Sequence, residues 1–178
     1  MSHISYSELK EWTDCAWKHK LNYIEKIKQF KGNEHTSFGS ALHTVCEIIV
    51  QKPDEKDLDI LFEQEFVKNL KKVKKADPNI NFSSDLVNSM RTQGKHIIQF
   101  ILPSLKKYFG KFKLVSVEEQ LYESIENEKI NKNFKGFVDL VIYTPDTKKF
   151  HIVDWKTCSW GWDSRKKSDK MITYQLTL

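Results

Sequence analysis

The sequence predicts an α/β protein of the α+β kind, with helices first and then a central, mostly antiparallel sheet flanked by helices. Two changes along the chain support this prediction. Apolar residues recur at helical spacing to about Tyr108, and from Phe112 onward they alternate as in half-buried strands. The 178 residues are 39% hydrophobic and 30% charged, which favours one globular domain and excludes collagen-like, disordered and disulfide-scaffold proteins.

Four helical segments are expected in the first part of the chain, and most have a recognisable start or stop signal. Ser5 and Glu8 form a capping-box pattern that opens the first segment. Pro53 ends the second segment, and Pro103 should kink or break the fourth. The expected helical ranges are 5–23, 38–50, 57–75 and 83–108.

Three strands are expected after the helices, at 112–124, 134–143 and 150–157. Residues 145–148 have the composition of a tight turn. If this turn joins the last two strands symmetrically, Asp139 and Asp154 face each other. Like charges at opposed positions destabilise a sheet by some tenths of a kcal/mol, so we expect a cation between these two carboxylates.

Lys156 lies on the same face of the last strand as Asp154, because side chains alternate along a strand. Two neighbouring carboxylates suit Mg²⁺ or Mn²⁺, and a nearby ammonium can orient or deprotonate a water. In the alternative interpretation both acids face solvent and Lys156 only neutralises them. Apolar neighbours such as Val141 and Ile152 count against that alternative, because carboxylates placed among them are costly without a cation.

The overall charge gives only a weak indication of partners. There are 29 Lys and Arg against 24 Asp and Glu, and the formal net charge of +5 permits a polyanionic partner without requiring one. No stretch approaches the roughly 20 apolar residues of a membrane span, and the first residues lack an apolar signal core, so we expect a cytoplasmic protein without membrane contact. Three widely spaced cysteines, Cys15, Cys46 and Cys158, fit reduced thiols.

Gly136-Phe137-Val138-Asp139, a hairpin, and a hydrophobic strand ending in Asp154-Trp155-Lys156 resemble the PD-(D/E)XK nuclease superfamily. Further patterns resemble its RecB-like exonuclease branch, which includes phage and CRISPR-associated nucleases. These patterns are G-x-x-x-H at 39–43, the start of a Q-x-x-x-Y helix at 174–176, and the opening segment 5–18. The resemblance spans nearly the whole chain. It implies one nuclease domain over 1–178 with a restriction-endonuclease-like core, helical to about residue 110 and sheet-forming from about residue 111.

The resemblance also implies a ligand set. One or two divalent cations, Mg²⁺ or Mn²⁺, would be bound by His43, Asp139, Asp154 and the backbone carbonyl of Trp155. Lys156 would position the attacking water, and Gln175 would contact that water or the nucleic-acid strand. Taken alone, His43 is more often a core or surface histidine, but Gly39 one turn earlier leaves room for close backbone approach.

Two acids precede the motif strands. Alternation places Glu119 with Val117 and Leu121, so Glu119 is expected to be the inward acid of the pair and to orient a metal ligand or Lys156. In the alternative, Glu118 and Glu119 are both solvated.

The segment after the last expected strand mixes aromatic stacking surfaces with cations and suits a single strand or a frayed end. Its residues are Trp160, Trp162, Arg165, Lys166 and Lys167. The alternative is a surface loop with one Trp buried. The helix that carries Gln175 lacks a cap, and the Tyr of its motif would follow Leu178, so we expect the complete protein to continue. Cys15 alone cannot hold an iron–sulfur cluster, so a cluster is either absent or completed by residues beyond Leu178; none is expected in this chain.

The expected function is therefore metal-dependent hydrolysis of phosphodiester bonds in DNA. The resemblance favours an exonuclease acting on DNA ends or single strands in recombination, repair or phage DNA processing, in the cytoplasm of a bacterial or phage-infected cell. A helicase or recombination partner is compatible with this role. The alternatives are a site-specific endonuclease or junction resolvase of the same superfamily, and a non-catalytic DNA-binding subunit.

Overall fold

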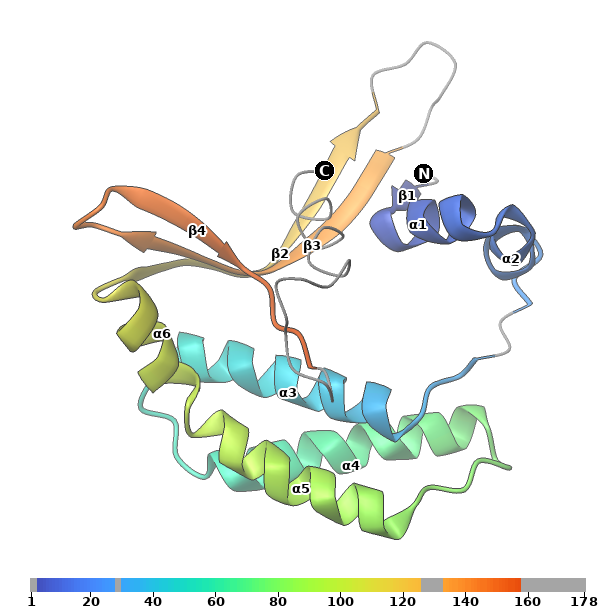
Figure 1. The fold of residues 1–178 in the computed structure, drawn as a ribbon, viewed down its shortest axis with the longest axis horizontal. Helices are drawn as coiled ribbons and strands as arrows, with labels where there is room; N and C mark the ends of the chain where they lie inside the picture. Colours follow the sequence, from blue (N-terminus) through green and yellow to red (C-terminus); the bar gives the residue numbers. More distant parts are fainter. Residues whose placement is uncertain (1–2, 28–29, 126–132, 158–178) are drawn as a thin grey trace. The chain divides into compact units, whose positions relative to one another are not determined.

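The computed structural model describes residues 3–27, 30–125 and 133–157 (Figure 1). Its helices are α1 (Tyr6–Asp14), α2 (Ala16–His19), the π-helical turn η1 (Lys20–Ile24), α3 (Glu34–Gln51), α4 (Leu58–Ala76), α5 (Ser84–Ile98) and α6 (Ile101–Phe109). Its strands are β1 (His3–Ser5), β2 (Lys113–Ser124), β3 (Asn133–Thr144) and β4 (Lys149–Val153). This order confirms the predicted α+β class and is consistent with a restriction-endonuclease-like core. Within the described ranges, no helix combines the length and apolar character needed to cross a membrane.

β3 is the central strand of a mixed sheet, because β1, β2 and β4 all pair with it. β3 and β4 are antiparallel, with Leu140 opposite Val153 and Thr144 opposite Lys149. This register is the one expected from a symmetric turn at residues 145–148. β1 pairs with β3 in parallel and was not predicted, because three residues are too few to show an alternating pattern.

The chain divides into two compact units. The first falls within residues 1–29, 118–138 and 157–178, and the second within residues 30–117 and 139–156.

Two apolar cores meet along α3 in the second unit. The larger core joins α3, α4 and α5, with the rings of Phe38, Phe62 and Phe66 packed together at centroid distances of 5.8 to 5.9 Å. The smaller joins α3 and α6 to the sheet through the buried residues Val50, Leu105, Leu140 and Ile142. Within the second unit, α3 is therefore held between the part of the sheet that carries Leu140 and Ile142 and the α4–α5 layer (Figure 1).

Capping explains where two helices begin. α3 starts at Glu34, earlier than predicted, because the side chains of Asn33 and Thr36 each accept a hydrogen bond from the other residue's backbone N–H. The predicted fourth helix is divided into α5 and α6 between Ile98 and Ile101. Pro103 therefore does not make the break. It lies in the first turn of α6, where its missing N–H removes no intrahelical hydrogen bond.

The first helix predicted for residues 5–23 is three short segments. Ser5 Oγ accepts a hydrogen bond from the Glu8 N–H at 3.2 Å, as the capping pattern predicts. The Glu8 carboxylate does not return to the cap but lies 3.0 Å from His19 Nε2. Cys15 is in an extended conformation with φ of −161° and separates α1 from α2.

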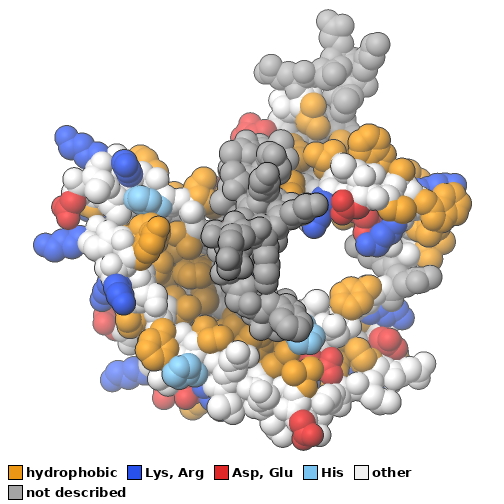
Figure 2. All heavy atoms as spheres, in the orientation of Figure 1, with side chains coloured by type: hydrophobic (Ala, Val, Ile, Leu, Met, Phe, Trp, Pro, Cys, Tyr) orange, Lys and Arg blue, Asp and Glu red, His pale blue; other side chains and the backbone are white. Residues whose placement is uncertain are grey.

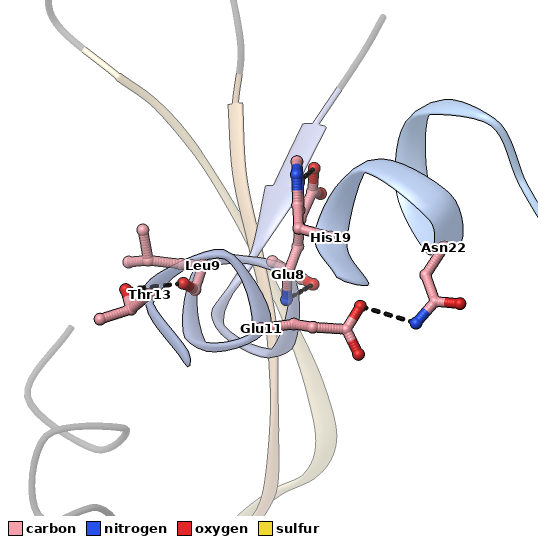
Figure 3. Close-up of polar contacts among 7 residues, drawn as sticks. Glu8, Leu9, Glu11, Thr13, His19 and Asn22 are labelled. Atoms are coloured by element: carbon pink, nitrogen blue, oxygen red, sulfur yellow. Dashed lines mark hydrogen bonds and ion pairs between the residues drawn. The ribbon is translucent and has the colours of Figure 1, made fainter. Parts of the chain in front are cut away.

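A second polar contact joins these segments. Asn22 of η1 donates a hydrogen bond to the Glu11 carboxylate at 2.8 Å, and the two side chains point toward each other (Figure 3). This hydrogen bond is the main reason why the pKa of Glu11 is lowered. Hydrogen bonds and ion pairs between α1 and the following turns therefore replace the continuous helix that the apolar spacing predicted.

Candidate active site

Asp139 lies where the β3–β4 ladder ends. The last pair of this ladder is Leu140 with Val153, so the next residues along the two strands are Asp139 and Asp154. The Trp155 backbone N–H donates a hydrogen bond to Asp139 Oδ2 at 2.7 Å. A side-chain carboxylate thus accepts a bond that a strand carbonyl would otherwise take, which explains why β4 ends at Val153 and not at the predicted residue 157.

α3 presents a histidine to the same carboxylate. His43 Nδ1 lies 3.6 Å from Asp139 Oδ2, and the side chains are 29% and 12% exposed. One turn further along α3, burial raises the pKa of the Cys46 thiol to about 12.

Asp154 and Lys156 form an ion pair. Lys156 Nζ lies 2.5 Å from Asp154 Oδ1, and the Asp154 side chain is only 11% exposed. The other carboxylate oxygen, Asp154 Oδ2, is buried and has no hydrogen-bond partner among the described residues. A buried carboxylate oxygen without a partner is costly, and a bound cation would satisfy it.

The two acids that precede the motif strands, Glu118 and Glu119, are both exposed on β2. Glu119 was expected to be the inward acid of this pair, whereas its side chain is exposed. Glu118 has a left-handed backbone with φ of 49°, which interrupts the alternation of the strand. Glutamate gives no sequence signal for that conformation, so the pattern could not identify it.

Carboxylates with one imidazole form a donor set that suits a divalent cation. The unpartnered Asp154 oxygen and the 3.6 Å distance from His43 Nδ1 to Asp139 Oδ2 show that the residues present fit a divalent cation.

The structure brings together four of the predicted residues as two contacting pairs, His43 with Asp139 and Lys156 with Asp154. Trp155 packs against the smaller core, and its backbone carbonyl as a metal ligand stays a prediction. The remaining predicted contact residues lie outside the described residues and also stay predictions. They are Gln175, Trp160, Trp162, Arg165, Lys166 and Lys167.

Comparison with known proteins gives one match. The family model described as the PD-(D/E)XK nuclease superfamily matches residues 3–178. No curated protein and no solved structure matches the chain. The matched range includes the Gly136–Asp139 and Asp154–Lys156 motifs and α3 with His43. The chain therefore belongs to the PD-(D/E)XK nuclease superfamily, whose members are nucleases that use divalent metal ions.

Proposed function

We propose that the chain is a metal-dependent deoxyribonuclease that hydrolyses phosphodiester bonds at the site of Asp139, Asp154 and Lys156. The main support is the state of Asp154. Its carboxylate is nearly buried, one oxygen is paired with Lys156, and the other has no partner among the described residues. A purely structural ion pair would not require a second carboxylate, a histidine and an unpartnered oxygen in the same region of the fold.

The protein's own groups have separate roles in this proposal. Asp139, Asp154, His43 and the Trp155 carbonyl would hold Mg²⁺ or Mn²⁺. When bound, the cation supplies Lewis acidity to the scissile phosphate and makes water a better nucleophile at neutral pH.

Lys156 orients the attacking water and offsets the negative charge that develops on the phosphate. The Trp155 N–H fixes one oxygen of Asp139, so this ligand is positioned before any ion binds. Gln175 is proposed to contact the water or the nucleic-acid strand.

For the substrate, we propose DNA ends or single strands, with a role in recombination, repair or phage DNA processing. The support is the resemblance of the G-x-x-x-H and Q-x-x-x-Y patterns to the RecB-like branch. The residues at 160–167 would stack on unpaired bases and bind phosphates.

The test is cleavage of end-labelled linear and closed-circular DNA, each single- and double-stranded, in Mg²⁺, Mn²⁺ or EDTA. An RNA oligonucleotide tests specificity for DNA. Asp154→Asn and Lys156→Gln should each lower the rate about 10²-fold to 10⁴-fold. Asp146→Asn and Lys149→Gln are matched controls, because they make the same changes at exposed positions of the same hairpin. The controls should retain the parent rate.

Degradation of linear DNA while circles survive would support an end-dependent enzyme. Cleavage of circles would instead identify an endonuclease of the same superfamily. Absence of both cleavage and Mn²⁺ binding in the parent chain would overturn the catalytic proposal and leave a nucleic-acid-binding subunit.

A further inference from the structure

The second half of α4 carries a row of lysines on one face. Lys68, Lys71, Lys72 and Lys75, here called the lysine stripe, follow an i, i+3, i+4, i+7 pattern and line one shallow surface pocket. Residues at this spacing lie on one side of a helix. The buried residues of α4 are Phe62, Phe66, Leu70 and Val73. In an ideal helix the lysine stripe therefore points away from the core.

Three of these four lysines have no ion-pair partner among the described residues. Lys68 pairs with Glu65 at 2.7 Å, whereas no ion pair among the described residues includes Lys71, Lys72 or Lys75. The helix dipole favours cations in the last turn, where Lys74 and Lys75 lie. That effect falls off within one turn, so it does not account for Lys71 and Lys72. Like charges at this spacing destabilise a helix, and a bound polyanion would reverse that effect.

We propose that the lysine stripe binds consecutive phosphates of a nucleic-acid strand, at a place separate from the cleavage site. This inference rests on the proposed nuclease function. From Lys68 to Lys75 a helix rises about 10 Å, and phosphates follow one strand of a duplex at about 3.4 Å along its axis. The lysine stripe therefore spans about three phosphates. Val67, in the same pocket, gives the lysine stems an apolar surface to lie against.

The location separates this contact from the chemistry. Within the second unit, α3 lies between the sheet half that carries Asp139 and the layer of α4 and α5 (Figure 1). The lysine stripe faces away from α3, so the strand bound there is not the strand positioned for cleavage. It anchors a flanking segment of the same molecule or a second molecule.

A second group of positive side chains provides the comparison. Lys and Arg side chains gather over α6 and the β3–β4 hairpin (Figure 2). Among them, Lys106 and Lys107 are exposed and consecutive, and Lys111 follows α6. α6 ends at Phe109, so Lys111 lies beyond the helix and these three lysines do not form one row along a helix as the lysine stripe does.

The experiment measures binding without cleavage. The full chain carrying Asp154→Asn is titrated onto labelled single-stranded and duplex DNA in Mg²⁺ at about 50 to 200 mM salt, and the logarithm of the affinity is plotted against the logarithm of the salt concentration. Each lost phosphate contact lowers the steepness of this plot by about 0.7 for single strands and about 0.9 for duplex. We expect the steepness of this plot to fall by about 2 to 3 in the variant that combines Lys71→Gln, Lys72→Gln and Lys75→Gln.

The control combines Lys106→Gln, Lys107→Gln and Lys111→Gln, which remove the same charge. An unchanged slope in the lysine-stripe variant would refute the proposal, as would an equal loss in the control, because the effect would then be one of net charge. The proposal would also be refuted if the lysine-stripe variant lost affinity for an acidic polypeptide but kept its affinity for DNA. Cleavage of a short oligonucleotide by the otherwise unmodified lysine-stripe variant should match the parent. If the parent cleaves DNA and only the predicted change of slope is missing, the proposed role of the lysine stripe is refuted and the nuclease proposal stands. If the parent neither binds nor cleaves DNA, the proposed function is refuted as well.

Discussion

Replacing Lys156 by Gln should separate metal binding from cleavage. In the structure the Lys156 ammonium lies 2.5 Å from Asp154 Oδ1 and holds a carboxylate that we propose as a metal ligand. Gln keeps much of the side-chain volume and removes the charge. The expected outcome is a metal affinity that is equal or higher, together with a strongly reduced rate.

The size of the effect follows from the geometry. At 2.5 Å and an effective dielectric constant of about 20, the Coulomb energy of the pair is about 7 kcal/mol. Lys156 is 34% exposed, so screening by water and the cost of desolvation leave a net contribution of about 1 kcal/mol. Removing a competing ammonium of that strength should tighten Mn²⁺ binding about fivefold. Loss of its action on the water and phosphate should slow cleavage about 10²-fold to 10⁴-fold.

The assay combines the paramagnetic signal of free Mn²⁺ with the initial rate of cleavage on one labelled DNA. Lys149→Gln is the matched control, because Lys149 is an exposed lysine of the same hairpin. If Lys156→Gln weakened Mn²⁺ binding by the same factor as cleavage, Lys156 would act by supporting the ion site and the assigned role would be refuted.

Three further predictions concern the packing around Gly94, the reactivity of the thiols, and the dependence of stability on pH. Gly94→Ala should lower the free energy of unfolding by about 1 to 3 kcal/mol, because the added Cβ would overlap the buried Phe62 ring. Ala is favoured over Gly in a helix by roughly 1 kcal/mol, which does not offset that clash. Urea unfolding measures the loss. Cys15 is exposed and should react with a thiol reagent at pH 8, whereas Cys46 should react only after unfolding. Burial raises the pKa of the Cys46 thiol from its usual 9.0 to about 12, so between these values the thiol keeps its proton in the folded chain and loses it in the unfolded chain. The free energy of unfolding should therefore fall as the pH rises from about 9 to about 12, and this pH-dependent loss should be absent in Cys46→Ala.

Controls for these predictions come from the same chain. Gly136→Ala adds a Cβ that meets nothing within 4 Å, so it should leave the urea midpoint close to that of the parent. An equal loss in both variants would show that the Phe62 ring is not the cause. Thiol counting is done with Cys158→Ser, which leaves only Cys15 and Cys46; two reactive thiols in the folded chain would contradict the burial of Cys46.

The sheet register was predictable because it depends on local chemistry. The turn at 145–148 fixes which residues of β3 and β4 face each other, and the structure has the expected pairs. The end of β4 was not predictable from that pattern. It depends on Asp139 accepting the Trp155 N–H, a contact between residues far apart in the chain that alternation does not report.

The helices show a similar limit. Apolar spacing identified α4 to within one residue at each end, because one face of that helix packs into the core. It failed over residues 5–23, where Cys15 is extended and polar contacts join separate segments. At the site, the spacing of residues 39–43 singled out His43, which lies 3.6 Å from Asp139. The left-handed backbone of Glu118 within β2 has no signature in the sequence.

The bond between Asp139 and Trp155 also determines which inactive variant will preserve the structure. An Asn side chain at position 139 keeps a carbonyl oxygen that can accept the Trp155 N–H, while it removes the negative charge that a metal ion requires. An Ala side chain would leave that N–H without its acceptor and release the end of β4. Asp139→Asn is therefore the form suited to trapping an uncleaved nucleic acid for structure determination, because binding can then be observed on an undistorted strand end.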